Sequence, residues 1–203
     1  MIKVKDTSRI PDLLKELEYL KNHEVQIGIF GEDDSFMAMI ASVHEFGATI
    51  RPKGKYLTIP LKAELRDVKP RDIPEELFVP KGTNVLARKA DNEKGFEALY
   101  ALVKEVKIPE RSFIRSAFDE NKTAMEKYIQ KLLIQLLNGE ITGQQLLDKV
   151  GLYCEGKIKK KIRDLKDPPK SSITLTLEGP DKNNPLIETG RMRQSVVYKV
   201  VSK

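Results

Sequence analysis

Residue types that commonly carry catalysis or bind metals are scarce in this sequence. Two histidines, His23 and His44, and one cysteine, Cys154, occur among the 203 residues. The pair His44 and Glu45 would begin the helical zinc motif of metalloproteases, but that motif needs a second histidine where this chain has Ala48. Neither histidine stands beside a carboxylate cluster with ligand spacing. We therefore predict no metal site and no cofactor.

The sequence also gives no support for a catalytic nucleophile or for a nucleotide-binding site. Cys154 falls on the apolar side of a predicted basic helix, and no serine stands in the glycine-flanked turn that exposes a hydrolase nucleophile. The glycine-rich dinucleotide fingerprint and the phosphate-cradling loop are both missing, and we interpret KGTN and EKGF as turns. We expect a protein that is not an enzyme and has no catalytic residues. An enzyme that uses His23 or His44 stays as a third interpretation.

A basic run near the end of the same predicted helix is the other group of chemically distinctive residues. The chain has 36 Lys and Arg against 30 Asp and Glu, and the run GKIKKKIRDLK concentrates this excess. Such a run can contact DNA phosphates, and in a ring it can line a channel. The competing interpretation is a solvated helix face, and no aromatic residue interleaves with the lysines to stack on bases. Any DNA contact is expected to be nonspecific, through Lys157, Lys159, Lys160, Lys161 and Arg163.

The overall composition bounds the class of protein. A chain of 203 residues can bury a core without help from a metal or a disulfide. A single cysteine excludes an internal disulfide, which fits folding in a reducing cytoplasm. The charged N-terminal segment lacks the apolar stretch of a signal peptide, and no window approaches the roughly 20 apolar residues of a membrane span. We therefore expect a soluble protein with no membrane partner.

Hydrophobic spacing predicts the elements of the N-terminal half. Leucines at helical spacing predict an amphipathic helix over residues 12–20, and alternating apolar residues predict a strand over 25–31. Residues 35–46 are predicted to form a short buried helix that Gly47 ends. The next region is rich in prolines and is predicted to be β-rich with long loops. Its predicted strands are 55–61, 76–79 and 85–88, with a strand or helical turn at 99–106.

The C-terminal half is predicted to contain a helical hairpin. A long apolar stripe runs from about residue 112 to Leu137, and a second helix covers about 143–165. Because the two stripes are adjacent in sequence, the helices should pack against each other. Residues 173–177 alternate as a strand or extended arm would. The terminal strand, 195–201, is able to join the sheet begun by 25–29.

These elements together predict an α+β fold. We expect a small mixed or antiparallel sheet packed against a long helical hairpin, with a β-rich loop insertion. We expect a single domain over 1–203, with the insertion at about 48–107 and an extended loop or arm at about 166–188.

Three segments stand in an order that resembles a known family. They are AMIASVHEFGA at 38–48, IPERSFIRSAFDE at 108–120 and PLIETGRMRQSVVYKV at 185–200. Together they resemble the neck and tail-completion proteins of tailed bacteriophages, also described as head-tail joining or virion morphogenesis proteins. The resemblance spans almost the whole chain. The region between the first two segments is longer than in shorter members, which leaves open whether the chain is a neck protein or a tail terminator.

The resemblance implies a structural virion protein of a tailed phage or of a phage-tail-like particle. Such a protein is made in the bacterial host cytoplasm and acts in the virion, where it forms a homo-oligomeric ring at the head-tail junction. The implied partners are the head connector or adaptor on one side and the tail terminator or tail tube proteins on the other. Loops around 48–95 and 166–188 would meet neighbours, and genomic DNA would pass the basic residues.

Arginines in the last two segments are candidates for subunit contacts. Their planar guanidinium groups suit directional ion pairs with carboxylates such as Glu45, Glu110 or Glu188, either within a subunit or across a ring interface. The possible interface residues are Glu45, Arg111, Arg115, Glu188, Arg191 and Arg193. The alternative from another class is a nonspecific DNA-binding accessory protein of phage packaging or assembly, carried by residues 156–166.

Overall fold

The computed structural model describes residues 9–179 and 181–203, and the predicted α+β class is confirmed. Helices make up 45% of the chain and small antiparallel sheets 19%. The chain divides into two compact units. The first comprises the described residues up to Ala41, Ser112–Asp164 and Thr189–Lys203, and the second comprises Ser42–Arg111 and Leu165–Glu188. The segments predicted as an insertion and as an arm, 48–107 and 166–188, both belong to the second unit.

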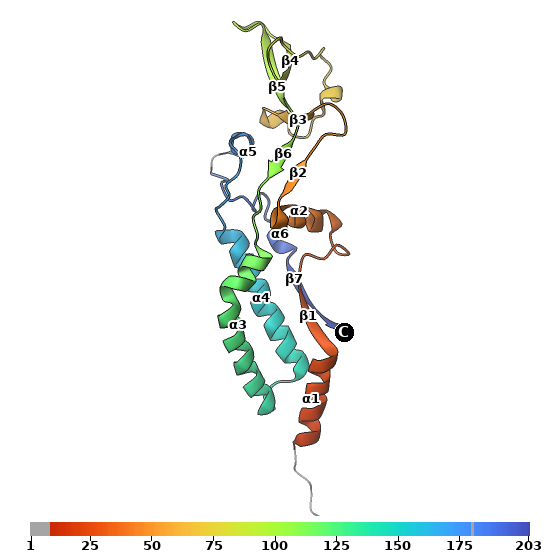
Figure 1. Ribbon diagram of the computed structural model, residues 1–203, viewed down its shortest axis with the longest axis vertical. Coiled ribbons are helices and arrows are strands. Elements are labelled where there is room, and N and C mark those ends of the chain that lie inside the picture. Colours follow the sequence, from red (N-terminus) through yellow and green to blue (C-terminus); the bar gives the residue numbers. More distant parts are fainter. Residues whose placement is uncertain (1–8, 180) are drawn as a thin grey trace, which may run out of the picture. The chain divides into compact units, whose positions relative to one another are not determined.

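A helical hairpin forms the body of the first unit, as predicted. Helices α3 (Ile114–Leu137) and α4 (Gly143–Asp164) lie side by side and run in opposite directions (Figure 1). Helix α1 (Ile10–Asn22) packs on both. The core between them contains Leu132, Leu136 and Leu146, with Leu13 and Leu20 of α1 packed against it. The sequence predicts these three helices because each has a long apolar stripe that only packing can cover.

The turn that leads into α4 is held by two sets of polar contacts. Thr142 and Gln145 form a capping box: the Gln145 amide donates to Thr142 Oγ1 at 3.2 Å, and the Thr142 amide donates to Gln145 Oε1 at 3.0 Å. The Gly143 amide donates to the Glu16 carboxylate of α1 at 2.5 Å. A carboxylate is favourable at a helix N-terminus, so Glu16 ties α1 to the start of α4.

The predicted pairing of the first and last strands is confirmed. Strand β1 (His23–Gly28) pairs antiparallel with β7 (Val197–Ser202), from His23 opposite Ser202 to Gly28 opposite Val197. We call this pair the ribbon. Both strands pack on α4, where a Cβ on Gly151 would lie 2.3 Å from the Tyr198 ring. Only glycine at position 151 therefore lets the helix approach the ribbon so closely.

Two further elements complete the first unit. Helix α2 (Ser35–Phe46) matches the predicted bounds and crosses from the first unit into the second. Asp34 caps its first turn, because the Met37 amide donates to Asp34 Oδ1 at 3.0 Å. The short helix α6 (Arg191–Gln194) precedes β7 and packs against α4.

The second unit is β-rich, as predicted. Strand β5 (Phe96–Val103) lies at the centre of an antiparallel sheet between β3 (Leu57–Pro60) and β4 (Val85–Lys89). A separate antiparallel pair joins β2 (Ala48–Ile50) to β6 (Val106–Ile108). Two 3-10 turns follow β3, η1 (Ala63–Leu65) and η2 (Pro70–Asp72). The predicted strand 76–79 is wrong: this segment makes a single bridge, Phe78 to Ala87, because prolines at 74 and 80 bracket it.

The arm in residues 166–188 contains a helix where the sequence predicts a strand or extended segment. Helix α5 (Ser172–Glu178) begins at Ser171, whose hydroxyl accepts the Thr174 amide at 3.2 Å, and ends at Gly179 with φ +103°. The run of alternating apolar residues in 173–177 is too short to distinguish the two-residue period of a strand from the 3.6-residue period of a helix. The N-terminal cap at Ser171 favours the helix. Helix α5 packs against η1 of its own unit.

Candidate functional site

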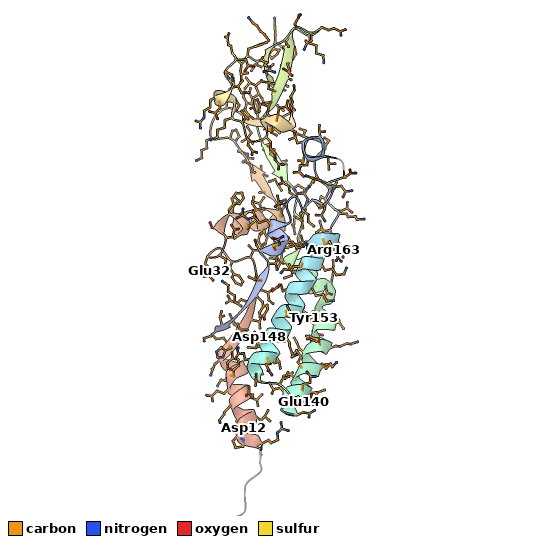
Figure 2. The ribbon with its side chains drawn as sticks, turned by 180° about the vertical axis from the view of Figure 1, so that it is seen from behind. Asp12, Glu32, Glu140, Asp148, Tyr153 and Arg163 are labelled. Atoms are coloured by element: carbon orange, nitrogen blue, oxygen red, sulfur yellow. The ribbon has the colours of Figure 1, made fainter. Side chains whose placement is uncertain are left out.

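The five cations predicted to contact DNA lie on α4 but do not share one face. Lys157 Nζ lies 4.9 Å above the ring of Tyr153, and Lys161 Nζ bonds Glu120 of α3 at 2.5 Å. Figure 2 labels Tyr153 within α4 and Arg163 near the end of that helix. The remaining three cations, Lys159, Lys160 and Arg163, line a common hollow. The cations of the basic run therefore lie in different environments, and only three of them line the hollow.

The hollow lies between α4 and α6 of the first unit, and we call it the basic hollow. It has a volume of about 340 Å³ and is lined by Gly156, Lys159, Lys160, Arg163, Arg193 and Gln194. The α4 residues follow a helical spacing that places them on one face. Arg193 comes from the third sequence motif, so two segments far apart in the sequence form the site. The sequence predicts Arg193 as an interface residue and does not group it with the lysines of α4.

Carboxylates compensate part of this positive charge. Lys159 bonds Glu155 at 2.6 Å, and Asp164 accepts from Arg163 at 2.7 Å and from Lys160. The hydrogen bonds from Arg163 and then Lys160 hold the pKa of Asp164 well below its usual range, so it stays ionised. Four cations thus line the hollow against two neighbouring carboxylates.

Arg111, a predicted interface residue, is buried and holds the arm within the second unit. Its side chain donates to the carbonyl oxygens of Pro168 at 2.7 Å and Pro169 at 2.6 Å. Its own amide donates to the carbonyl of His44 at 2.7 Å. A guanidinium group can serve several acceptors at once, which lysine cannot do with the same geometry. Arg111 therefore joins the end of α2 to the start of the arm.

His44 faces the same guanidinium group. Its Nδ1 lies 3.4 Å from Arg111 Nη1, and burial followed by the charge of Arg111 lowers the pKa of His44. Since arginine can only donate, His44 accepts through Nδ1 as a neutral ring. The second histidine, His23, belongs to the first unit and stacks on Tyr19 with the ring centroids 3.9 Å apart.

The first and second sequence motifs meet around Gly47. This glycine has φ +70°, and a Cβ there would lie 3.0 Å from the amide nitrogen of Glu110 and 3.1 Å from the carbonyl oxygen of Ile108. Glu45 is also buried, with 3% of its surface exposed. The motif residues 44–47 and 108–111 therefore serve the packing of the second unit.

Two other predicted interface residues, Arg191 and Glu188, form ion pairs with residues outside the three motifs. Arg191 bonds Asp34 at 2.8 Å in the first unit, and the Met37 amide and Arg191 together lower the pKa of Asp34 against a smaller effect of burial. Glu188 bonds Arg66 at 2.5 Å in the second unit. Arg115 is exposed on the first turn of α3. Asp34 and Arg66 were not predicted as partners from the sequence, because neither lies in a motif.

Arg66 anchors the arm a second time, and Lys170 forms a buried ion pair within the arm. Lys170 bonds Glu178 of α5 at 2.5 Å, and both side chains are only 7% exposed. Arg66 reaches Glu178 at 3.6 Å. A buried pair of this kind fixes one arrangement of the segments that carry it. The arm is thus attached to its own unit by ionic contacts at one end and by Arg111 at the other.

Cys154 is a packing residue in this geometry. Its sulfur lies 3.1 Å from the sulfur of Met125 on α3, and burial raises the pKa of the Cys154 thiol. A thiol with a raised pKa is a poor nucleophile at neutral pH. Across residues 9–179 and 181–203, no group of three or more His, Cys, Asp or Glu is placed to hold a metal ion. Over the same residues no helix has the length and apolar character of a membrane span.

Several large hydrophobic side chains are exposed on the first unit. Among its described residues, ten large hydrophobic side chains are exposed while twelve hydrophobic residues are buried. Six of them form what we call the apolar flank: Ile10, Leu14 and Leu17 on α1, and Leu133, Ile134 and Leu137 on α3. Ile10 and Leu137 also line a hollow of about 310 Å³ between these helices. Single exposed leucines are ordinary on a monomer, whereas here six exposed hydrophobic side chains lie on two helices that contact each other.

Comparison of the chain with models of protein families, with curated proteins and with solved structures finds no match. The function must therefore be argued from the residues and their geometry.

Proposed function

We propose that the protein is a structural virion subunit of a tailed phage or phage-tail-like particle, and that it forms a ring at the head-tail junction. In this role it joins the connector to the tail without catalysing a reaction. The observation that carries the proposal is the apolar surface of the first unit, where exposed large hydrophobic side chains nearly equal the buried hydrophobic residues in number.

The apolar flank supports an assembling protein because its residues follow one side of each helix. Ile10, Leu14 and Leu17 are spaced by four and three residues, so they project from the same side of α1. Their exposed fractions are 65%, 60% and 42%. Side chains of this size are stabilised by removal from water, at about 25 cal/mol for each Å² covered. A partner that covers the flank would therefore gain affinity from it.

The assignment to a phage junction depends on the three ordered sequence motifs. The contacts of these motifs support it, because each motif has a place in the subunit fold. Residues 44–47 and 108–111 pack together, while the third motif supplies β7 and the ion pair of Arg191 with Asp34. Motifs that build the subunit leave the helix surfaces outside them available for contacts with other copies.

Electron microscopy of particles from the genome that encodes the chain tests the proposal. The chain should occur as a closed ring at the neck or at the tail end, identified by density or by a tag on one terminus. Deletion of its gene should leave unjoined heads and tails, and expression of the intact chain in trans should restore joined particles. If mature particles lack the chain, the proposal is wrong.

The basic hollow favours a second candidate function, nonspecific contact with DNA. Four cations line it, and the two carboxylates beside them leave an excess of positive charge. The variant Lys159→Gln, Lys160→Gln, Arg193→Gln should then weaken DNA binding. It should also reduce the slope of log affinity against log salt by about 0.9 for each DNA phosphate that the variant no longer neutralises.

A matched control is available on the same helix. Lys157→Gln with Lys161→Gln removes positive charge from α4, but neither residue lines the hollow. For each positive charge removed, this variant should lose less of the slope of log affinity against log salt than the hollow variant loses. An equal reduction of the slope per charge in both variants would mean that net charge, and not the hollow, attracts DNA.

A further inference from the structure

The ribbon in the first unit has two open edges. Among the strands that the structure describes, β1 pairs only with β7, and neither strand has a neighbour on its other side. Each outer edge presents a row of backbone amides and carbonyls that can pair with another strand. The ribbon is six residue pairs long and its register continues without a shift. It is therefore long and regular enough to accept a further strand on either side.

The sheet of the second unit protects its edges in ways that the ribbon does not. Its edge strand β3 ends in Pro60, which has no amide to donate, and β4 has a register shift between Leu86 and Ala87. Phe78 also bridges to Ala87 on the outer side of β4. Prolines and bulges are the usual means of blocking edge pairing. Neither HEVQIG of β1 nor VYKVVS of β7 contains a proline.

The face of the ribbon directed away from α4 carries charged residues on both strands. Tyr198 packs on Gly151 of α4, so residues that alternate with Tyr198 lie on the opposite face. On that face β1 carries Glu24, which accepts from Gln26 at 2.9 Å, and β7 carries Lys199. Lys199 also bonds Glu32 at 2.5 Å and Asp33 at 2.8 Å, which hold its side chain in place. The β1 strand thus presents the carboxylate of Glu24 on this face, whereas the ammonium group of Lys199 on β7 is compensated within its own copy by Glu32 and Asp33.

We propose that the ribbons of neighbouring copies join edge to edge, with β7 of one copy pairing with β1 of the next. The partner is a second copy of this chain, and the proposal rests on the function proposed above. Because β1 and β7 are antiparallel within a copy, copies related by rotation about a ring axis present antiparallel edges to each other. The contact is heterologous, since it uses a different edge on each side, and repeated heterologous contacts form a ring when the rotation between copies closes.

Charge and symmetry together favour this arrangement over two alternatives. Pairing β7 with β1 of the next copy places the Lys199 strand beside the Glu24 strand at every junction. Pairing β1 with β1 would place the Glu24 carboxylates of two copies on adjacent strands, which is unfavourable across a sheet. Pairing β1 with β1 or β7 with β7 is also isologous, so either contact would give dimers in place of a ring.

Disulfide trapping in the assembled particle tests the proposal. All chains carry Cys154→Ala, so that the single native thiol is removed. One chain then carries Glu24→Cys or Gln26→Cys on β1, and a second chain with a larger tag carries Val197→Cys, Lys199→Cys or Val201→Cys on β7. The two chains are co-expressed in cells that assemble the particle, and the purified particles are oxidised and run on a non-reducing gel. The six combinations scan the unknown register between copies, since a disulfide needs Cα atoms about 4.4–6.8 Å apart.

The expected result is a band that contains one chain of each tag, strong in at least one combination and absent when Lys122→Cys on α3 replaces the β1 cysteine. Rings that are visible by electron microscopy but give no such band in any combination would overturn the edge contact and leave the proposed ring function intact. Particles that contain no ring of this chain would overturn both. Using several positions on each strand guards against a single variant that fails to fold.

Discussion

Antiparallel strands have different structural roles in the two units. In the second unit the central strand β5 is paired on both sides and buries Leu99 and Tyr100, which are 2% and 1% exposed. Each outer strand there has a feature that blocks further pairing, Pro60 in β3 and the register shift in β4. In the first unit the ribbon of β1 and β7 packs on α4 and has both edges open among the described strands. The difference indicates a division of labour, in which one sheet completes itself and the other is completed by a neighbour.

The largest expected effect concerns the self-contained sheet. Tyr100→Ala would remove a buried ring together with the hydrogen bond that the Tyr100 hydroxyl donates to the Val68 carbonyl at 2.8 Å. We expect the free energy of unfolding of that unit to fall by about 3–5 kcal/mol, because the variant leaves a cavity and buries less apolar surface. Hydrogen exchange measured by region should show faster exchange in β3, β4 and β5.

The ribbon should be nearly unaffected by that change if the units are independent. Tyr100→Phe serves as the matched variant, since it keeps the ring and removes only the hydroxyl, at an expected cost of about 0.5–1.5 kcal/mol. Equal acceleration of hydrogen exchange in the ribbon and in the three-stranded sheet would contradict the independence of the two units, because the two regions would then unfold together.

A smaller effect is expected from the close contact behind the ribbon. Gly151→Ala places a Cβ 2.3 Å from the Tyr198 ring, so the helix and the ribbon must separate locally. We expect the free energy of unfolding to fall by about 1–3 kcal/mol, the usual cost of overpacking. Gly156→Ala is a control on the same helix, where the new Cβ meets nothing within 4 Å. It should stabilise the helix by about 0.5–1 kcal/mol, and denaturant unfolding curves of the two variants should move in opposite directions.

The ribbon and the helices behind it are the parts that the sequence predicts best. The stripes of α1, α3 and α4 extend over several turns, and the alternation in β1 and β7 leaves little choice of face. Such long periodic segments allow few alternatives. The short pairs of the second unit, β2 with β6, were not predicted, because three residues carry too little pattern to be recognised.

The candidate site was predicted only in part, because its members meet through the tertiary fold. The lysines of α4 are evident from the sequence, but helix geometry turns Lys157 and Lys161 away from the hollow and tertiary packing brings Arg193 in. Arg111 was a candidate for an ion pair within the subunit or across an interface, and within the subunit it donates to two proline carbonyls. Backbone acceptors carry no sequence signal, so a partner of that kind cannot be predicted from residue types.

The comparison also predicts that the second unit has a pH dependence of its own. Burial and Arg111 lower the pKa of His44 in the folded protein below 6.5. The unfolded chain then binds more protons than the folded one below pH 6.5, so stability is full above that pH and falls as the pH decreases toward the folded pKa. Thermal unfolding at several values between pH 5 and pH 8 measures this decrease.

The variant His44→Gln keeps a hydrogen-bond acceptor near Arg111 and removes the titration. Its unfolding temperature should change less than that of the unmodified protein between pH 7 and pH 5. Hydrogen exchange should place the decrease in stability in the second unit, around residues 44–47 and 108–111, and not in the ribbon. An unchanged pH dependence in the variant would assign the effect to other groups.

The smallest expected effect on the isolated chain, and the sharpest test of the difference between the sheets, is a charge change on the ribbon. Glu24→Lys places an ammonium group on β1 that, in the proposed contact, would repel Lys199 of the next copy and compete with it for Glu32 and Asp33. The fold of a single chain should be unaffected, because Glu24 is exposed and accepts from Gln26 on the same strand. Ring assembly should weaken and should recover in high salt, which screens exposed charges. The matched change Glu75→Lys in the second unit also reverses an exposed carboxylate, one that bonds Arg88 of β4, and it should leave assembly unaltered. If the two variants assemble equally well, the ribbon edge is not the contact between copies, and the open strands of the first unit serve another partner.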